Sequence, residues 1–591
     1  MIISCNKEDL NYIICGDLNI NMLKSNCLND ILDIYGCKNI VRKPTCFKSN
    51  VPTLLDVVIT NVPKSLQHVT CIDCDLSDFH HMVCFATKMH APVIKKRHIR
   101  YRSYKKFDEN AYSQDLANIP YQVSDVFDDV DDAYWFCQTL IRQVIDEHAP
   151  LKTRIIKNNQ VPYMNGQLRK AINVKNMIKR KFYKYRSTAN WENYRHHRNM
   201  VIKLRKESTR QYLRDKGTMS GNGKDFWKTV KPLIANKFVS KSNVITLMEN
   251  GNIVNNPNDV SNVINEYYVN ITKAIGCEDL LLDTDKFEDI VKTHVTNSSV
   301  CRIKDSIAKN NNFSFSLVTT EQVYAKLKNI KSKKAPGYDA IPPKLVKAGA
   351  RELCRPIACI INKCITTSTF PDCLKLAEVA PIFKKENILD KKNYRPVSIL
   401  PCFSKVFESI LVDQMSEFLE PMLSSHLSGF RKNHSCQNVL LQMVEKCKSN
   451  LDNHGVSGAL MTDLSKAFDC LPHRLLVAKL DAYGFNPDAC MLVANYFTNR
   501  YQRVKIGDAR SDWLNLTKGA PQGSIFGPFT YNLHSNDLLY LIEDFCDIYN
   551  YADDNTICVH RDNVSDVLSN IEIVSEVLLN WFKTNYLQAN P

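Results

Sequence analysis

The sequence lacks any uncharged apolar run that approaches the roughly 20 residues needed to cross a bilayer. Its first nine residues have no cationic flank leading into an apolar segment, which argues against a signal peptide. It also has no internal repeat and no low-complexity tract. These absences argue against membrane-spanning, secreted and repeat proteins, and we expect no membrane partner.

The cysteines lack the spacing of a zinc-binding motif. The chain has 22 cysteines, and Cys71 and Cys74 form the one close pair, with no second pair or histidine following at zinc spacing. Without a secretion signal, cysteines in a protein of this size are typical of reduced intracellular thiols. We therefore expect buried free thiols rather than disulfides or a zinc site at Cys71.

The size and charge of the chain favour several modules and a polyanionic partner. Its 591 residues exceed what one hydrophobic core can serve, so we expect three or four modules. The formal net charge is +15. Residues 151–216 contain 19 Lys and Arg against three acids, and this single stretch accounts for the whole excess.

Four regions follow from composition and hydrophobic spacing. Residues 1–90 hold short apolar runs typical of strands, and residues 91–230 carry helical spacing and the basic excess. Residues 231–310 are rich in Asn, Ser and Asp, which predicts a polar linker with some helix. Residues 311–591 alternate apolar helices with strand–turn–strand patterns, which predicts an α+β domain.

Three separated patterns in the last region predict a catalytic cleft. The apolar run 456–462 is typical of a buried strand, and Asp463 follows it where a helical pattern begins. Asp553 and Asp554 lie at the tip of a predicted hairpin. Between these two patterns, residues 519–524 form a Gly-rich loop that contains Gln522, and its glycines permit close backbone approach.

Phosphoryl transfer to a 3′-hydroxyl uses two Mg²⁺ ions, and hard cations prefer carboxylate oxygens. Asp463 and Asp553 could bridge two ions, with Asp554 as a supporting charge; Mn²⁺ is an alternative ion. Each pattern alone has a simpler explanation, since Asp463 could be an N-cap and two acids could form a solvated turn. Their conjunction, in order and at domain-scale spacing, favours the catalytic interpretation.

The sequence resembles the reverse transcriptases of non-LTR (LINE-type) retrotransposons. Asp463-Leu-Ser-Lys-Ala-Phe-Asp469, Gly519-Ala-Pro-Gln-Gly-Ser524 and Tyr551-Ala-Asp-Asp554 are similar to motifs A, B and C of that family. Four further matches extend the resemblance through the rest of this region: Lys334-Ala-Pro-Gly-Tyr-Asp-Ala-Ile-Pro342, Pro381-Ile-Phe-Lys-Lys385, Asn393-Tyr-Arg-Pro-Val-Ser398 and Ser428-Gly-Phe-Arg431.

This resemblance implies a right-hand polymerase with fingers and palm that copies a template RNA onto a DNA primer or target DNA using dNTPs. It assigns metal binding and catalysis to Asp463, Asp553 and Asp554. It places Lys384 or Lys385, with Arg395, at the triphosphate, Phe468 under the sugar, where it excludes ribonucleotides, and Gln522 beside the nucleotide. A solvated surface position is the alternative for each basic residue. The family's thumb would lie beyond Pro591.

The first 90 residues resemble the C-terminal half of an endonuclease/exonuclease/phosphatase domain, a four-layer α/β sandwich. The resemblance rests on Gly16-Asp-Leu-Asn19, on the run 55–61 and on Ser77-Asp-Phe-His80. It implies roles at the scissile phosphate for Asp17, Asn19, Asp56, Asp78 and His80, with His81 as an alternative to His80. Because the domain's first half is not present, we expect no endonuclease activity from this remnant.

The basic stretch predicts two helices. Leu168, Ile172, Met177, Ile178 and Phe182 have the spacing of an amphipathic helix, and a second helix could run over 191–212. Nucleic-acid contact and a solvated helical linker are both compatible with this pattern. The candidate contact residues are cations of the first helix and its end: Arg169, Lys170, Lys179, Arg180, Lys181, Lys184 and Arg186.

Two functions compete at this point. The first is an RNA-directed DNA polymerase, and the second is an inactive truncated element copy that binds nucleic acid without polymerising. The three carboxylates favour the first, whereas the truncation at both ends that the two resemblances imply favours the second. The life cycle implied by the resemblance places the protein inside the cell, in the cytoplasm and the nucleus.

Overall fold

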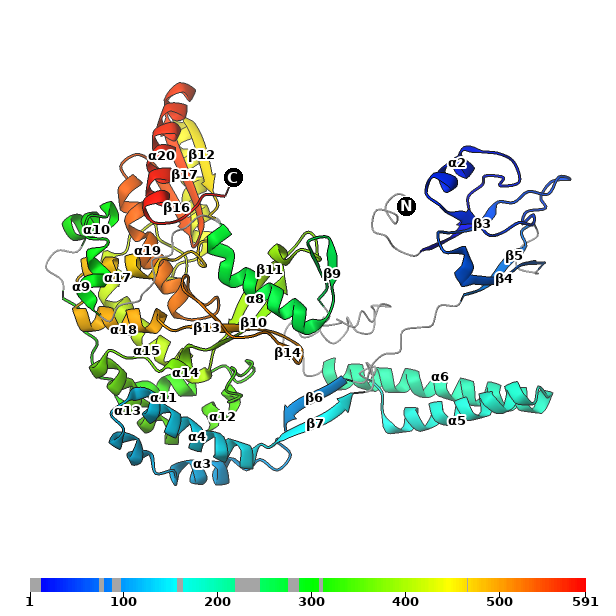
Figure 1. Ribbon diagram of the computed structural model, residues 1–591, viewed down its shortest axis with the longest axis horizontal. Helices are drawn as coiled ribbons and strands as arrows, with labels where there is room; N and C mark the ends of the chain where they lie inside the picture. Colours follow the sequence, from blue (N-terminus) through cyan, green and yellow to red (C-terminus); the bar gives the residue numbers. More distant parts are fainter. Residues whose placement is uncertain are drawn as a thin grey trace. The chain divides into compact units, whose positions relative to one another are not determined.

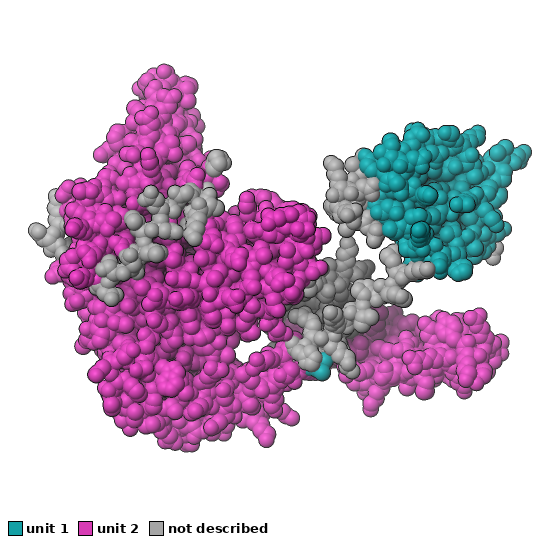
Figure 2. Space-filling view, viewed as in Figure 1, with its two compact units in different colours: residues 1–97, 155–160 teal, residues 98–154, 161–591 magenta. Residues whose placement is uncertain are grey.

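The computed structural model describes residues 12–73, 79–87, 97–156, 163–217, 245–274, 286–307, 312–464 and 466–590. The chain divides into two compact units (Figure 2). Unit 1 comprises residues 1–97 and 155–160, and unit 2 comprises residues 98–154 and 161–591.

Unit 1 is built from small antiparallel sheets. One sheet has the strand order β1–β3–β2, and a second pairs β4 with β5. A short helix, α2, lies against the first sheet, and Leu32, Val57 and Ile59 belong to the shared core. The elements are β1 (Ile13–Asp17), α2 (Cys27–Ile34), β2 (Lys38–Asn39), β3 (Asp56–Thr60), β4 (Leu66–Ile72) and β5 (Met82–Thr87).

The largest core of unit 2 is helical. Helices from distant parts of the sequence contribute to it, including Tyr134 of α4, Ile357 of α13 and Leu475 of α17. Its helices are α3 (Glu109–Ala117), α4 (Val130–His148), α9 (Phe287–Lys292), α10 (Ser298–Arg302), α11 (Thr320–Lys328), α12 (Pro343–Ala348), α13 (Ala350–Thr367), α14 (Asp372–Lys375), α15 (Cys402–Leu419), α17 (His473–Ala482) and α18 (Pro487–Phe497).

A five-stranded sheet carries the predicted finger motifs. Its order is β11–β10–β13–β14, with β15 also paired to β13. Helix α8 packs on this sheet through Val260, Ile264 and Tyr268 (Figure 1). The elements are β8 (Leu247–Glu249), β9 (Asn252–Val254), α8 (Pro257–Ala274), β10 (Ala377–Phe383), β11 (Tyr394–Ile399), β13 (Tyr501–Ile506), β14 (Ala509–Arg510) and β15 (Leu514–Asn515).

The described parts of residues 231–310 depart from the predicted polar linker. Residues 245–274 form part of the core on the finger sheet, and Ile290, Val300 and Ile303 are buried in the helical core. Helices α3 and α4, within the predicted basic linker 91–230, also lie in that core. Burial of these apolar stripes outweighs the polar composition of the segments around them.

The palm sheet has the order β12–β17–β16 and is antiparallel throughout. Helix α20 covers one face, and α16 covers the other. Gly458 lets α20 approach closely, since a Cβ there would lie 2.4 Å from Val567. The elements are α16 (Cys436–Asp452), β12 (Val456–Thr462), α19 (Phe526–Ile542), β16 (Asp547–Tyr551), β17 (Asp554–Arg561) and α20 (Val564–Thr584).

The basic stretch forms a helical hairpin, as its spacing predicted. Helix α5 (Gly166–Lys184) packs against α6 (Thr188–Gly217) through Leu168, Ala171 and Ile178. Before it, β6 (Arg97–Arg102) pairs with β7 (Leu151–Ile156). In the described part of the chain, no helix combines the length and the apolar character that a membrane span requires.

Candidate active site in the palm

Asp463 follows β12 directly, at the end of the palm sheet. The register pairs Thr462 with Asn555, so Asp463 lies beside the start of β17. Asn590 holds it in place: the Asn590 backbone N–H donates to the Asp463 carbonyl at 2.8 Å, and Nδ2 donates to Oδ2 at 2.9 Å. One carboxylate oxygen of Asp463 therefore has a protein donor.

Asp553 and Asp554 lie at the tip of the β16–β17 hairpin, as predicted. Ala552 adopts a left-handed φ of 61°, and Asn550 Nδ2 bridges the Ala552 carbonyl at 2.9 Å and Asn555 Oδ1 at 2.8 Å. Gly429 lies against this turn, since a Cβ there would be 2.3 Å from the Ala552 nitrogen. The buried amide and the close glycine fix the tip that carries both acids.

The strand register places the three carboxylates at the same end of the palm sheet, and their charges act on Asp554. Burial raises the pKa of the Asp554 carboxyl above its usual value, and the charges of Asp553 and then Asp463 raise it further. No Lys or Arg in the described chain pairs within 4 Å with these three acids. Neighbouring carboxylates without a cation repel one another, so a divalent ion would stabilise the site.

The three acids fit divalent metal binding by type and by position. They supply hard oxygen donors from two adjacent strands, and Asp553 and Asp554 are free of competing protein cations within the described residues. In the described chain, two other groups bring three ligand atoms within 4.8 Å of one another, and the palm acids are spaced more widely.

Phe468 lies in an aromatic cluster beside the acids. Its ring centroid is 4.6 Å from that of Tyr531 and 6.0 Å from that of Phe430. The negative charges of Asp553 and Asp554 help raise the pKa of Tyr531, after burial as the main cause. The structure therefore brings Phe468 toward the carboxylates, on a ring held from two sides.

Gln522 is fixed by partners that the sequence did not reveal. Its side-chain Nε2 donates to the two carboxylate oxygens of Asp469 at 3.0 and 3.2 Å. Its backbone carbonyl accepts from the Ser398 backbone N–H at 2.8 Å. Burial raises the pKa of Asp469 to about 6. Asp469 thus positions Gln522.

Two glycines of the same loop are required by close backbone contacts. Gly519 has a φ of 73°, and a Cβ would lie 2.6 Å from the Asp469 carbonyl; at Gly523, φ is 124° and a Cβ would lie 2.7 Å from the Ser398 carbonyl. His473 Nε2 lies 2.7 Å from the Gly519 carbonyl. Burial lowers the pKa of His473 to about 4, so the ring is neutral at pH 7.

The three predicted triphosphate residues lie on one β-ribbon. Lys384 and Lys385 follow β10, and Arg395 lies on β11 opposite Ile382. All three are exposed, and Lys385 pairs with Glu386 at 3.4 Å. The fold brings them together on the fingers, although neither Lys384 nor Lys385 is favoured by its contacts.

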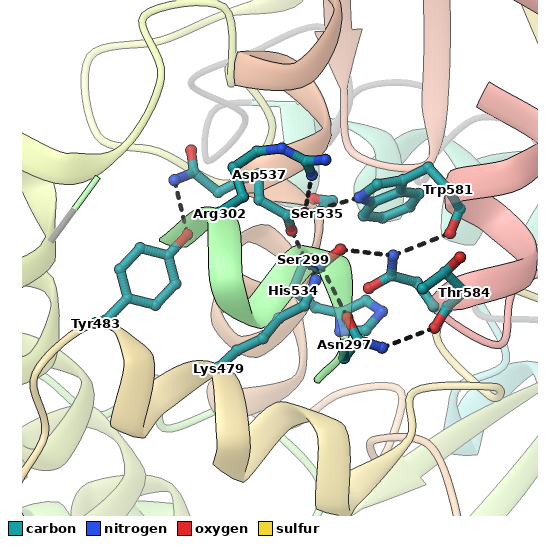
Figure 3. A network of polar contacts seen from close by, with 12 residues as sticks. Asn297, Ser299, Arg302, Lys479, Tyr483, His534, Ser535, Asp537, Trp581 and Thr584 are labelled. Atoms are coloured by element: carbon teal, nitrogen blue, oxygen red, sulfur yellow. Dashed lines mark hydrogen bonds and ion pairs between the residues drawn. The ribbon is translucent and has the colours of Figure 1, made fainter. Parts of the chain in front are cut away.

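A buried polar network secures the helices behind the palm sheet (Figure 3). Asp537 of α19 is fully buried and accepts hydrogen bonds from Lys479 Nζ at 2.6 Å, Trp581 Nε1 at 2.8 Å and Arg302 Nη1 at 3.3 Å. Nearby, Asn297 Nδ2 donates to the Thr584 carbonyl at 3.2 Å. The network joins α10, α17, α19 and α20, four elements from distant parts of the sequence.

Unit 1 brings together three of its predicted residues. The strand register places Asp17 opposite Asp56, and His80 Nδ1 lies 2.8 Å from Asp56 Oδ2. Ligand atoms of Asp17, Asp56 and His80 lie within 4.8 Å of one another. The Asn19 backbone N–H donates to Asp17 Oδ1 at 2.8 Å. Asp78 and Cys74 lie outside the described residues.

The choice between His80 and His81 has a structural answer in this unit. His80 faces Asp56, whereas the ring of His81 packs on Phe47 with centroids 4.2 Å apart. His81 also lies 4.0 Å from Asp73. The cluster with Asp17 and Asp56 therefore contains His80.

The α5–α6 hairpin presents most of its predicted cations to solvent. Lys179 is half-buried with Nζ 5.5 Å from the Tyr183 ring centroid, and Lys184 Nζ lies 5.1 Å from the Tyr185 ring centroid. Tyr183 and Tyr185 are themselves more than half exposed. The remaining candidates are exposed: Arg169, Lys170, Arg180, Lys181 and Arg186.

Comparison with known proteins defines the class of the palm region. Residues 382–591 match the family model for reverse transcriptase (RNA-dependent DNA polymerase). This part of the chain, which includes the three palm acids, is therefore a reverse transcriptase domain.

Three similar proteins come from Drosophila melanogaster. The probable RNA-directed DNA polymerase from transposon BS is 24% identical over 283 residues, covering 46% of this chain and 31% of the relative. The probable RNA-directed DNA polymerase from transposon X-element is 31% identical over 208 residues, covering 35% and 23%. The RNA-directed DNA polymerase from mobile element jockey is 24% identical over 284 residues, covering 46% and 31%. The aligned parts thus span no more than about a third of these relatives.

Proposed function

We propose that the chain is the RNA-directed DNA polymerase of a non-LTR retrotransposon, transferring dNMP from a dNTP to a primer 3′-hydroxyl on a template RNA. The observation that carries this proposal is the convergence of Asp463, Asp553 and Asp554 at one end of the palm sheet. The reverse transcriptase match over residues 382–591 and the printed names of the relatives support it.

In this proposal Asp463, Asp553 and Asp554 hold two Mg²⁺ ions, or Mn²⁺ in their place. Bound ions would lower the pKa of the primer hydroxyl and stabilise the charge on the leaving pyrophosphate. Lys384 or Lys385, with Arg395, would bind the triphosphate, since Arg grips phosphate bidentately and Lys acts as a point charge. Phe468 would exclude the ribose 2′-hydroxyl, and Gln522, positioned by Asp469, would line the nucleotide pocket.

The basic α5–α6 hairpin is proposed to bind RNA by contacting the RNA's sugar–phosphate backbone. Exposed cations beside exposed tyrosines suit salt-sensitive phosphate contact with base stacking. The life cycle inferred for such an element implies translation in the cytoplasm and DNA synthesis at nuclear DNA.

Unit 1 is proposed to be a nuclease-like remnant of an endonuclease/exonuclease/phosphatase domain without endonuclease activity of its own. The cluster of Asp17, Asp56 and His80 supports the relationship. Incubation of the purified chain with supercoiled DNA and Mg²⁺ tests the expected inactivity. Nicking that disappears in Asp78→Ala and His80→Gln would contradict it.

The alternative function is a relic that binds nucleic acid without polymerising. The hydrogen bond from Asn590 to Asp463 Oδ2 favours this alternative, because it occupies an oxygen that a metal ion would use. Polymerisation therefore requires that the ions displace Asn590 or use the other oxygen of Asp463.

Primer extension separates the two functions. The purified chain is given poly(rA), oligo(dT), dTTP and Mg²⁺, beside the variant Asp553→Asn and the control Asp544→Asn, which changes an exposed acid outside the site. We expect extension by the unaltered chain and the control, and none by Asp553→Asn. A folded chain that binds RNA without extending the primer would support the relic instead.

A further inference from the structure

Two cysteines and a histidine meet on the face of the palm sheet opposite α20. Cys447 lies on α16, and Cys558 and His560 lie on β17, two residues apart and so on the same face. One ligand atom from each lies within 4.8 Å of the others. Cys558 is buried and Cys447 is half-buried, so the cluster is enclosed yet reachable from solvent.

The strand register places one residue beside each ring nitrogen of His560. Asp547 of β16 is directly opposite Cys558, and Ser457 of β12 is directly opposite His560. Directly opposite residues share one face of a sheet. Asp547 Oδ2 accordingly lies 3.4 Å from His560 Nε2, and Ser457 Oγ lies 2.8 Å from Nδ1.

His560 has one ring nitrogen without a hydrogen bond. Its side chain is 9% exposed, and Nε2 is buried and has no hydrogen-bond partner among the described residues, although Asp547 is near. Nδ1 is bonded to Ser457, whose Oγ also accepts from Asn450 Nδ2 at 3.0 Å. A buried ring nitrogen without a hydrogen bond, opposite a ring nitrogen anchored to an oxygen, is the arrangement that a metal-binding histidine uses when Nδ1 carries the proton.

The ligand atoms of Cys447, Cys558 and His560 lie close enough together to converge on one ion. Zinc–sulfur and zinc–nitrogen bonds of about 2.3 and 2.0 Å put neighbouring ligand atoms roughly 3.3–3.8 Å apart. The 3.4 Å between Asp547 Oδ2 and His560 Nε2 falls in this range. The ligand atoms of Cys447, Cys558 and His560 lie within 4.8 Å of one another, and Asp547 contacts this group through His560. Lys446 Nζ, 3.9 Å from Asp547 Oδ2, would offset the negative charge of two thiolates and a carboxylate.

We propose that Cys447, Cys558 and His560 form a structural zinc site that ties α16 to the β16–β17 hairpin, and that Asp547, which lies beside His560, completes the coordination when the ion binds. Binding of Zn²⁺ replaces the two thiol protons, which pass to solvent, and no electrons are exchanged. The soft sulfur ligands select zinc over the hard Mg²⁺ proposed for the palm acids. The site would hold the hairpin that carries Asp553 and Asp554 against the helix behind it.

Cobalt substitution and metal analysis test the proposal. The full chain is purified with Zn²⁺, its zinc content is measured after dialysis, and it is then exchanged with Co²⁺ to record the thiolate-to-cobalt charge-transfer absorption. Cys447→Ser and His560→Gln remove ligands, while Cys436→Ser removes an exposed cysteine from the same helix as the matched control. Asp547→Asn tests the fourth ligand.

We expect about one zinc ion per chain to be lost in Cys447→Ser and in His560→Gln but kept in Cys436→Ser. The thiolate–cobalt absorption should fall in the first two variants, and their thermal midpoints should drop toward that of the chelated chain. Equal zinc content and absorption in all variants would overturn the proposal, as would an unaltered chain that takes up no metal at the thiols. A Cys447–Cys558 disulfide found by mass spectrometry in the freshly purified chain would also overturn it.

Discussion

Phe468 is the side chain whose contacts make the sharpest prediction about substrate choice. Its ring contacts the rings of Tyr531 and Phe430 near the palm acids. Phe468→Ala should raise the use of UTP relative to dTTP by about 10–100-fold, because loss of the ring is equivalent to about 1.4–2.8 kcal/mol of discrimination. Single-nucleotide incorporation with each substrate measures the ratio of kcat/KM.

Phe545→Ala is the control for that experiment, since it removes an exposed ring on the loop before the hairpin. An unchanged UTP-to-dTTP ratio in Phe468→Ala would show that this ring does not face the sugar.

The buried, neutral ring of His473 should make the stability of the folded chain depend on pH. Its pKa is about 4 in the folded chain because the ring is buried, against about 6.5 when unfolded. The unfolded chain therefore takes up the proton first, and the stabilisation present above pH 6.5 is lost as pH falls toward 4. This pKa difference between the folded and unfolded chain corresponds to about 3 kcal/mol of unfolding free energy.

His473→Gln should therefore flatten the stability profile between pH 6.5 and 4, measured by urea unfolding at each pH. The variant comparison is essential, since Asp469, with a pKa raised to about 6, favours the folded chain as pH falls over part of the same range. If the unfolding free energy of the variant and of the unaltered chain changed with pH in parallel, His473 would not be a buried, neutral ring.

Individual residues were predictable where a pattern is local. The acids were predicted to follow β12 and to occupy a hairpin tip, and that is where they lie. Asp469 as the partner of Gln522 was not foreseen, because the contact joins positions 53 apart in the chain. The cluster of Cys447, Cys558 and His560 has no sequence signature for the same reason, since strand register and helix packing create it.

Among the secondary-structure elements, α19 and α20 depend on one buried acid. Asp537 accepts hydrogen bonds from three donors. Asp537→Ala therefore removes the acceptor of the Lys479 ammonium, the Arg302 guanidinium and the Trp581 indole N–H. Breaking such a pair costs about 3–5 kcal/mol of unfolding free energy. Lys479→Met should cost less, because Arg302 still pairs with Asp537.

Urea unfolding of both variants measures this difference. Asp413→Ala, which removes an exposed ion pair with Lys326, is the control and should cost less than about 1 kcal/mol. If Asp537→Ala costs no more than Asp413→Ala, the network in Figure 3 does not hold these helices together.

Elements were predicted well where hydrophobic spacing stands out from its surroundings. Strand β12 occupies 456–462 as predicted, and α5 and α6 match the basic helical stretch. Helix α8 was obscured by the Asn-rich composition around it, although Val260, Ile264 and Tyr268 recur at helical spacing and are buried. Average composition hides a single apolar stripe, which is why 231–310 resembled a linker.

For the molecule as a whole, the charge gathered in one hairpin predicts how RNA binding responds to salt. The double variant Lys181→Gln with Lys184→Gln should weaken RNA binding. It should also make the negative slope of log K against log salt shallower by about 1.4, because each phosphate contact on single-stranded RNA contributes about 0.7. Fluorescence anisotropy over a salt series measures the slope.

Lys105→Gln with Lys106→Gln removes two exposed cations outside the hairpin and serves as the matched control. Equal salt slopes for the two double variants would assign RNA binding elsewhere in the chain.

The division of the chain also shows what sequence patterns alone leave open. The two resemblances suggested separate nuclease and polymerase parts joined by linkers, and the structure has two compact units with the first ending near residue 97. Most of the supposed linker region instead belongs to unit 2, where α3, α4, α8 and α9 complete cores built by residues from 312 onward. Such long-range packing is invisible to local periodicity.

The central claim is that three palm acids hold two metal ions for nucleotide transfer. Single-turnover incorporation of one dTMP on poly(rA)/oligo(dT), followed as the Mg²⁺ concentration rises, tests it most directly. We predict a rate that grows with the square of subsaturating Mg²⁺ and falls at least about 1,000-fold in Asp553→Asn, equivalent to about 4 kcal/mol of barrier. A folded, RNA-bound chain with no incorporation, or with the same rate in Asp553→Asn, would contradict it.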